Sequence, residues 1–428
     1  MSKRVFYFLI GFLLVGGLGM MFLIMAVIGY LDGHLEQWFD SRTVAEPFAM
    51  VETPVSTAVP PPTLTPTPEL IQPTILPTAV ATEEARKSVQ VMVTIDRSNL
   101  PDLYYTALTL KTEVGRVDEI RVTADGSELP FLYDPEVGIV QYTTDASEIF
   151  IDVLGGDDDF VLGLTEKTFL RDDKQWAWSH GFDDNVFLFE GIDLFVQKGW
   201  RGSVFLIGEI IDEERDEDWI VDQPAVNRLL ADGWSIGSHG WLADCTDKER
   251  SYLEQSFDLL ADIVALSPVP EYKVINFAAP CFFDEYHPLV LAIRDSGERT
   301  VLFNESQNQF YQIMNVAAAE IETEERLAVP LDLDLPIGRD FAVEFEPQEV
   351  VQANIDWAAA LGADGVPLWY NSGSHGSQEE NLAPMIDYVY DTYGPAGDDS
   401  VWVAPSDEIV SYALVRELAI VTVEVMDK

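Results

Sequence analysis

Two adjacent carboxylates, Asp183 and Asp184, follow a short aromatic run and stand directly before a helical pattern. The run at 176–178 is typical of a buried strand, and α/β folds commonly place their chemistry where such strands end. Neighbouring carboxylates at that position can divide the tasks of metal ligand and general base. The alternative is a solvated Asp-Asp turn that caps the following helix.

Three of the five histidines accompany predicted strand ends. His239 follows a short strand at 234–237, His375 lies just beyond a strand at 366–370, and His180 precedes the two carboxylates. In a parallel barrel, all three would lie toward the C-terminal rim of their strands. We therefore expect them to converge on the carboxylates.

The segment 171–428 alternates between strand and helix patterns, which predicts an α/β fold. A distorted (β/α) barrel of parallel strands is favoured, and an open doubly wound sheet is the alternative. The predicted strands are 202–207, 234–237, 273–277, 300–303 and 366–370, and the predicted helices are 186–199, 224–232, 247–266, 347–361 and 408–417.

The segment 87–165 has a different character, with short β-branched and aromatic runs separated by turn signals such as Asp125-Gly126. This spacing predicts a small all-β, sandwich-like domain that serves as a spacer or as a glycan-binding module. The predicted strands are 89–95, 103–110, 119–123, 138–143 and 148–153.

The N-terminal part carries a membrane signal. Residues 5–31 contain no charged side chain, follow Lys3 and Arg4, and precede Asp32. Their length and flanking charges predict a single-pass signal anchor, with residues 1–4 cytoplasmic and the later domains extracytoplasmic; a cleaved signal peptide is the alternative. The Pro- and Thr-rich segment 32–86 predicts an extended stalk.

The formal net charge of −49 excludes nucleic acid as a partner, because the chain could not neutralise phosphates. Two cysteines, Cys245 and Cys281, cannot build a disulfide framework. Neither feature predicts an oligomeric state.

Four motifs occur in order between residues 181 and 239, and they resemble the polysaccharide deacetylases of the NodB-homology type (carbohydrate esterase family 4). They are Gly-Phe-Asp-Asp-Asn at 181–185, Ile-Asp-Leu-Phe-Val-Gln-Lys-Gly at 192–199, Ser-Val-Phe-Leu-Ile-Gly at 203–208 and Leu-Leu-Ala-Asp-Gly-Trp-Ser-Ile-Gly-Ser-His at 229–239. Weaker matches continue at 277–280 and 401–412.

The resemblance implies a distorted (β/α) barrel and metal-dependent removal of acetyl groups from amino sugars. It implies that Asp183 is the general base that activates water, and that Asp184 and His239 bind a divalent metal ion, usually zinc. His375 is the candidate acid for the departing amine, although the family's Leu-x-His spacing points to Tyr370 instead.

The sequence departs from the family pattern in its remaining parts. Ala243 stands at the position of the second metal histidine, and Asp244 is the candidate replacement as third ligand. Ala278 aligns with the arginine that orients the base. The family's Asp-x-x-x-Trp partner of that arginine has three imperfect candidates: Asp332, Asp334 and the pair Asp356-Trp357.

The resemblance also places the loops that carry Cys245 and Cys281 side by side at the rim. An extracytoplasmic compartment permits disulfides, so we expect these cysteines to form one; two unpaired buried thiols are the alternative.

The sequence thus predicts a membrane-anchored hydrolase of carbon–nitrogen bonds that deacetylates envelope or extracellular glycan. Two alternatives remain: a catalytically impaired glycan-binding module, and a related hydrolase of a non-sugar amide or ester.

Overall fold

The computed structural model describes residues 88–155, 164–211, 221–241, 249–280, 286–297, 299–305, 310–376 and 379–427. The expected signal anchor at 5–31 and stalk at 32–86 lie outside these residues. Within the described ranges, no helix combines the length and the apolar character needed to cross a membrane.

The first strands form two antiparallel sheets that share one apolar core, in the orders β20-β1-β7-β3-β4 and β5-β6-β2-β8. Buried and less buried residues alternate along β1, as expected for a strand with one face on the core. The bounds are β1 (Ser88–Asp96), β2 (Leu108–Glu113), β3 (Glu119–Ala124), β4 (Ser127–Glu128), β5 (Phe131–Asp134), β6 (Ile139–Thr144), β7 (Glu148–Leu154) and β8 (Thr165–Lys167).

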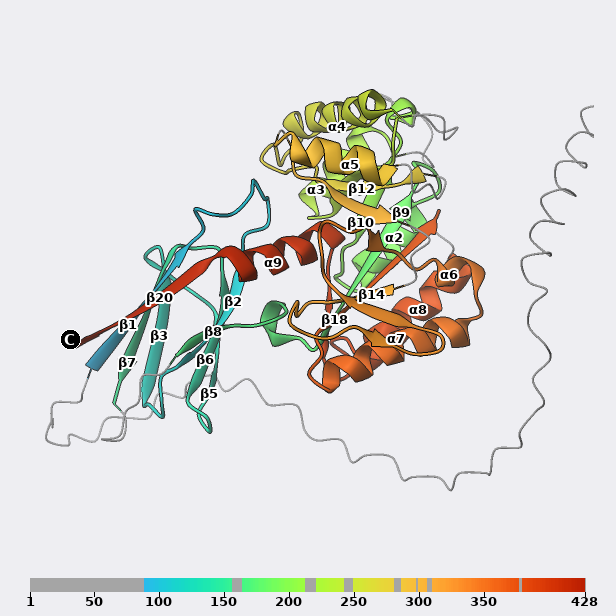
Figure 1. The fold of residues 1–428 in the computed structure, drawn as a ribbon. Coiled ribbons are helices and arrows are strands. Elements are labelled where there is room, and N and C mark those ends of the chain that lie inside the picture. Colours follow the sequence, from blue (N-terminus) through green and yellow to red (C-terminus); the bar gives the residue numbers. More distant parts are fainter. Residues whose placement is uncertain are drawn as a thin grey trace, which may run out of the picture. The chain divides into compact units, whose positions relative to one another are not determined.

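A strand from the far end of the described chain completes this sandwich. The sequence predicts that residues 171–428 all belong to the barrel, but β20 (Ile420–Asp427) pairs antiparallel with β1 (Figure 1). Val421 lies opposite Ile95 and packs against the core of the sandwich, whereas Val423, opposite Val93, is 40% exposed. The C-terminal strand therefore belongs to the sandwich.

The larger part is an α/β structure, as predicted, built on an 11-stranded sheet of mostly parallel strands. The strand order is β15-β16-β14-β18-β9-β10-β11-β12-β13-β17, and β19 also pairs with β9. The bounds are β9 (Trp176–Asp183), β10 (Ser203–Leu206), β11 (Ser235–Ser238), β12 (Asn276–Ala278), β13 (Leu302–Glu305), β14 (Phe310–Ile313), β15 (Ile321–Glu322), β16 (Leu327–Pro330), β17 (Ile337–Gly338), β18 (Leu368–His375) and β19 (Val401–Val403).

This sheet curls back on itself. β13 pairs with β17, and two residues later a bridge between Asp340 and Ser372 returns the chain to β18. The bridge therefore connects the first and last of the parallel strands from β18 to β17. The side chains on the inner faces of these strands point toward one another.

Helices cover the outer face of the sheet. Figure 1 shows α3, α4 and α5 grouped near β10 and β12, and α6, α7 and α8 grouped near β18. The helices are α2 (Phe189–Gln197), α3 (Gln223–Ala231), α4 (Arg250–Ala265), α5 (Tyr286–Asp295), α6 (Ala342–Phe345), α7 (Gln348–Ala363), α8 (Glu379–Thr392) and α9 (Ser406–Leu418), with single 3₁₀ turns η1 (Arg171–Asp173) and η2 (Gly208–Ile210).

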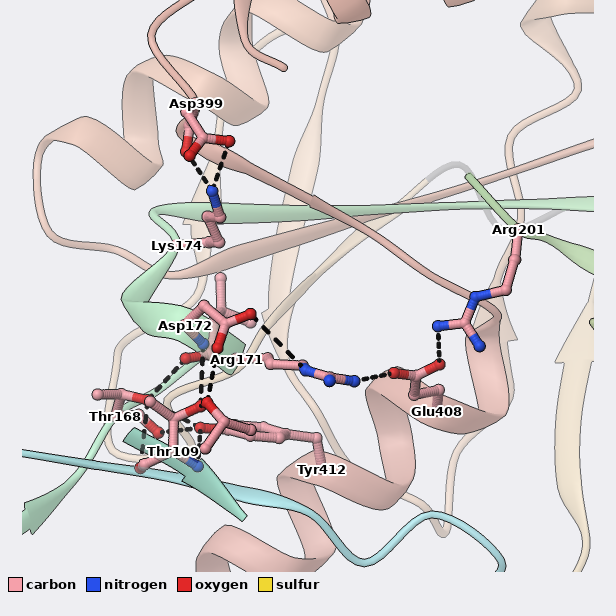
Figure 2. Close-up of polar contacts among 11 residues, drawn as sticks. Thr109, Thr168, Arg171, Asp172, Lys174, Arg201, Asp399, Glu408 and Tyr412 are labelled. Carbon is pink, nitrogen blue, oxygen red and sulfur yellow. Dashed lines mark hydrogen bonds and ion pairs between the residues drawn. The ribbon is translucent and has the colours of Figure 1, made fainter. Parts of the chain in front are cut away.

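Helix α9 links the two parts through polar contacts at its first and second turns. Figure 2 shows Arg171 and Arg201 converging on the buried Glu408. Arg171 Nη1 donates to Glu408 Oε1 at 2.6 Å, and Arg201 Nη2 donates to Glu408 Oε2 at 3.0 Å. One turn later, the Tyr412 hydroxyl contacts the hydroxyl of Thr168 at 2.8 Å and accepts from the backbone N–H of Thr109. The sandwich strand β2 is therefore tied to the same helix that leads into β20.

Glu408→Gln is expected to lower the free energy of unfolding by about 2 kcal/mol, because both guanidinium groups lose a largely buried counter-charge while remaining about one-third exposed. Urea denaturation measures the loss. Glu417→Gln on the same helix is the control, since Glu417 is 62% exposed and its pair with Arg416 spans 4.0 Å. Equal stability of the two variants would contradict this role of Glu408.

Candidate active site

Two of the predicted site residues end adjacent parallel strands. Asp183 is the last residue of β9 and His375 is the last residue of β18, and the two are register partners. The strand β18 therefore runs five residues beyond the predicted end at 370. His239 follows β11 directly, so it lies at the same C-terminal edge of the sheet.

Strand parity separates His180 from this group. Side chains alternate between the two faces of a strand, so His180 points to the face opposite Asp183. Its ring nitrogens contact Ser372 Oγ and Ser374 Oγ, and its ring stacks on that of Phe195 of α2 with the ring centroids 5.7 Å apart. Burial, followed by the charge of Arg339, lowers its pKa to about 3. The expectation that His180 converges with the other two histidines is therefore wrong, and it is a neutral core residue.

The structure gives Asp183 a partner that the sequence did not reveal. Arg339, just after β17, donates from Nη2 to Asp183 Oδ2 at 2.6 Å, and both side chains are only 1% exposed. The position expected for this arginine is occupied by Ala278 on β12. The counter-ion of the carboxylate thus comes from a different strand.

The interior of the curled sheet is shaped to hold this arginine. The guanidinium lies between the rings of Phe205 and Phe341, 4.7 and 4.9 Å from their centroids, an arrangement that favours a desolvated cation. A Cβ at Gly373 would stand 2.7 Å from Arg339 Nη2, and one at Gly181 would stand 2.6 Å from Phe205. Glycines on β18 and β9 are therefore required for Arg339 and Phe205 to fit.

The charge around Asp183 keeps it ionised. Burial alone would raise its pKa, but the Arg339 guanidinium, with further contributions from His239 and His375, holds that pKa below its usual range. Its second oxygen, Oδ1, is buried and has no hydrogen-bond partner among the described residues. Asp183 is thus a buried carboxylate with one oxygen held and the other available.

His239 is oriented by the backbone. Its Nδ1 lies 2.9 Å from the carbonyl oxygen of Ala278, which can only accept, so in the neutral ring Nδ1 carries the proton and Nε2 presents its lone pair. Nε2 lies 3.6 Å from Asp184 Oδ1 and 4.0 Å from Asp183 Oδ2. Two ligands of one tetrahedral zinc ion stand about 3.3–3.5 Å apart. The separation of His239 Nε2 and Asp184 Oδ1 is slightly longer than this range, so a small movement would bring the two side chains to two positions of a zinc site.

The remaining predicted ligand falls outside the described residues. Asp244 lies in the segment 242–248, as do Ala243 and Cys245, and Cys281 lies in 281–285; the expected disulfide stays a prediction. Within the part of the chain that the structure describes, no three or more His, Cys, Asp or Glu side chains are placed so that together they could hold a metal ion.

His375 has an acidic partner that was also not predicted. Glu344 on α6 accepts from His375 Nδ1 and from the His375 backbone N–H, each at 3.0 Å. This hydrogen bond raises the pKa of His375, and the charges of Asp183 and Asp184 act in the same direction against the effect of burial. His375 is therefore biased toward its protonated, acidic form.

The other acidic candidates lie elsewhere. Asp334 is exposed and pairs with Arg294, and Asp356 accepts hydrogen bonds from Tyr388 and Tyr393. Asp332 is exposed and accepts from the backbone N–H of Asp334.

Tyr370 is excluded from the site by parity, since it shares the outer face of β18 with Ser372. Its hydroxyl donates to Asp340. The cluster at the strand ends thus consists of Asp183, Asp184, His239 and His375, and is called the strand-end cluster below.

The sequence does not predict Arg339 and Glu344 as site residues, because each contacts the site only through the closure of the sheet. The only signal for Arg339 is that the pair Arg339-Asp340 stands between Ile337-Gly338 and Phe341-Ala342, in a chain with 25 basic residues against 74 acidic ones. Glu344 carries no comparable signal. Both lie in the segment that follows the closing strand β17.

Solved structures of deacetylases are similar to part of this chain. Peptidoglycan deacetylase PdaC of Bacillus subtilis is 12% identical, with a TM-score of 0.34 over 57% of this chain and 94% of its own. A polysaccharide deacetylase of Bacillus cereus is 12% identical, with a TM-score of 0.31 over 54% and 91%. A CE4 esterase of Streptococcus mutans is 13% identical, with a TM-score of 0.33 over 54% and 86%.

No protein-family model and no curated protein matches the chain. At these TM-scores the likeness to solved deacetylases is partial.

Proposed function

We propose that this protein is a metal-dependent hydrolase that removes acetyl groups from amino sugars of cell-envelope or extracellular polysaccharide. The observation that supports it most is the strand-end cluster, in which a buried carboxylate with a buried counter-ion stands beside a histidine biased toward protonation. Hydrolysis of an amide is assisted by a general base and a general acid, and the two adjacent strands supply one of each. The motif resemblance supplies the substrate class.

In this proposal Asp183 is the general base. Its ionised state is maintained by Arg339, and its Oδ1 has no partner among the described residues, so that oxygen accepts the proton of the attacking water. Arg339 does not touch the substrate; it holds the carboxylate in place and keeps its pKa low.

Asp184 and His239 would hold the metal ion, which we propose is zinc, with Asp244 as a third ligand. A divalent ion bound there lowers the pKa of water and polarises the acetyl carbonyl. The fixed tautomer of His239 supports this assignment, because its Nε2 lone pair faces Asp184.

His375 completes the reaction as the general acid. Its proton passes to the nitrogen of the departing amine, and Glu344 stabilises the imidazolium form before that transfer. Because His375 and Asp183 are register partners on adjacent strands, the two proton transfers occur on a single substrate group.

The location of the enzyme is part of the proposal. The apolar segment 5–31 would anchor the chain in the cell membrane, and the stalk 32–86 would carry the folded part into the extracytoplasmic space. A glycan of the envelope would then be within reach of the site.

Purified full-length protein is expected to release acetate from hexa-N-acetylchitohexaose or from peptidoglycan fragments, and a chelator should abolish the release. Asp183→Asn should lower kcat by about a hundredfold or more, because an amide cannot accept the proton. Asp232→Asn, at the opposite end of β11, is the control and should retain full activity.

Two other results would redirect the assignment. Glycan binding without acetate release by metal-loaded protein would indicate a catalytically impaired binding module. Release only from non-sugar amides or esters would indicate a related hydrolase.

Arg339→Ala is expected to raise the pKa of Asp183, since the effect of burial is then no longer opposed by the guanidinium. The acidic limb of the pH–rate profile should move to higher pH, with kcat at neutral pH reduced about a hundredfold. Arg339→Lys keeps the charge and should restore part of the rate. Chemical denaturation of both variants separates this effect from loss of fold, and an unshifted acidic limb in a folded variant would refute the assignment.

Glu344→Gln should affect the opposite limb. Glu344 raises the pKa of His375, so without its carboxylate the imidazolium loses its proton at lower pH. The alkaline limb of the pH–rate profile should move to lower pH while the acidic limb stays in place. A profile that drops in height without any shift would show that Glu344 only supports the fold.

A further inference from the structure

A cavity of about 440 Å³ lies on the outer face of β18, where helix α7 and strand β14 also line it. We call it the outer cavity. Its volume falls within the range of about 300–1,000 Å³ that is usual for small-molecule sites. Tyr370 and Asp340 line it, and Tyr370 is on the face of β18 opposite His375. The outer cavity is therefore separate from the strand-end cluster.

Asp340 is a carboxylate in the wall of this cavity and is only 8% exposed. Its Oδ1 accepts from the backbone N–H of Ala342 at 2.8 Å. Its Oδ2 accepts from Asn354 Nδ2 and from the Tyr370 hydroxyl, each at 2.9 Å. These hydrogen bonds fix the carboxylate, but each of them comes from a neutral group.

The counter-ion distinguishes Asp340 from the buried carboxylates described above. Asp183 pairs with Arg339, whereas Asp340 forms no ion pair with any cation of the described residues. Burial raises the pKa of Asp340, and the charge of Glu346 acts in the same direction. A cation in the outer cavity would oppose both effects, because it stabilises the ionised carboxylate.

The rest of the lining adds to the negative charge. Glu325, Glu346 and Glu349 are exposed carboxylates of the cavity wall, and Arg326 is its one guanidinium. With Asp340, four carboxylates and one guanidinium give the lining a formal charge of −3. Among the described residues, no three carboxylates are close enough to share a metal ion, so the charges are spread along the cavity. This spread favours a ligand with several separated positive charges over a single ion.

Two buried aromatic rings supply an apolar surface between these charges. Tyr311 of β14 and Tyr370 of β18 both line the cavity, and their rings stack with centroids 5.3 Å apart and an interplanar angle of 24°. An aromatic face attracts an ammonium group and also packs against methylene groups. The lining thus combines carboxylates for ammonium groups with aromatic surface for the alkyl chain between them.

We propose that the outer cavity binds an aliphatic polyamine. One ammonium group pairs with Asp340, a second lies near Glu346 and Glu349, and the methylene groups pack against Tyr311 and Tyr370. A triamine with three positive charges balances the formal charge of the lining. This site takes no part in the proposed hydrolysis and does not depend on it.

The test is isothermal titration calorimetry of the purified full-length protein with spermidine, a triamine. The titration uses about 0.15 M salt, at which charges more than about 8 Å apart are largely screened. One saturable site is expected. The neutral diol of the same chain length should not bind, and equimolar Mg²⁺ should not displace spermidine.

Four variants locate the site. Asp340→Asn keeps the shape of the side chain and should raise Kd for spermidine at least tenfold, and Glu346→Gln should raise it about fivefold. Glu417→Gln removes the same charge from exposed surface of α9 and should leave Kd unchanged. Ala353→Phe, at an exposed position of α7 that lines the cavity, changes no charge and should abolish the saturable binding because the ring fills the space.

Two results would overturn the proposal. Equal weakening by Glu346→Gln and Glu417→Gln would show that spermidine only joins the counter-ions of a chain with a net charge of −49. Undiminished binding by Ala353→Phe would show that it binds outside the cavity. Urea denaturation confirms that each variant folds, and if Asp340→Asn does not, Glu346→Gln and Ala353→Phe decide. Asp183→Asn should bind spermidine as the wild type does, whether or not the protein releases acetate.

Discussion

The buried ion pair between Asp183 and Arg339 is the interaction on which the site depends. A carboxylate that is 1% exposed cannot remain charged without a partner, and loss of one member of such a pair costs about 3–5 kcal/mol. The interior of the sheet is arranged around this requirement: Gly373 leaves the space for the guanidinium, and two phenylalanine rings enclose it. The pair also joins the last residue of β9 to the segment that closes the sheet at Asp340.

Much of the fold could be predicted because its elements carry local patterns. Predicted strands at 89–95 and 148–153 correspond to β1 and β7, and the helix predicted at 347–361 corresponds to α7. The misses are of two kinds. Helix α8 contains Pro384 and lacked a recognised pattern, whereas β20 alternates clearly but was assigned by proximity in sequence to the barrel. The residue pattern of a single strand does not reveal which strand it pairs with when the partner lies more than 300 residues away in the sequence.

The site divides in the same way. Asp183, Asp184 and His239 could be named from the sequence because each lies within or directly beside a strand whose end is visible in the apolar pattern. The alternation of side chains along a strand then determines which residues face the interior of the sheet. It excludes His180 and Tyr370 from the strand-end cluster only when the strand boundaries are known. Arg339 and Glu344 could not be named, because their partners are brought to them only by the curling of the sheet.

The pairing of β20 with β1 sets an order on the maturation of the chain. A polypeptide that leaves the ribosome N-terminus first exposes one edge of β1 long before the complementary strand has been made, and the whole α/β part is synthesised in the interval. Strands β1 to β8 of the sandwich are thus synthesised first, the elements of the curled sheet follow, and β20 is synthesised last. The pairing of β20 with β1 can therefore form only after the chain of the curled sheet has been synthesised.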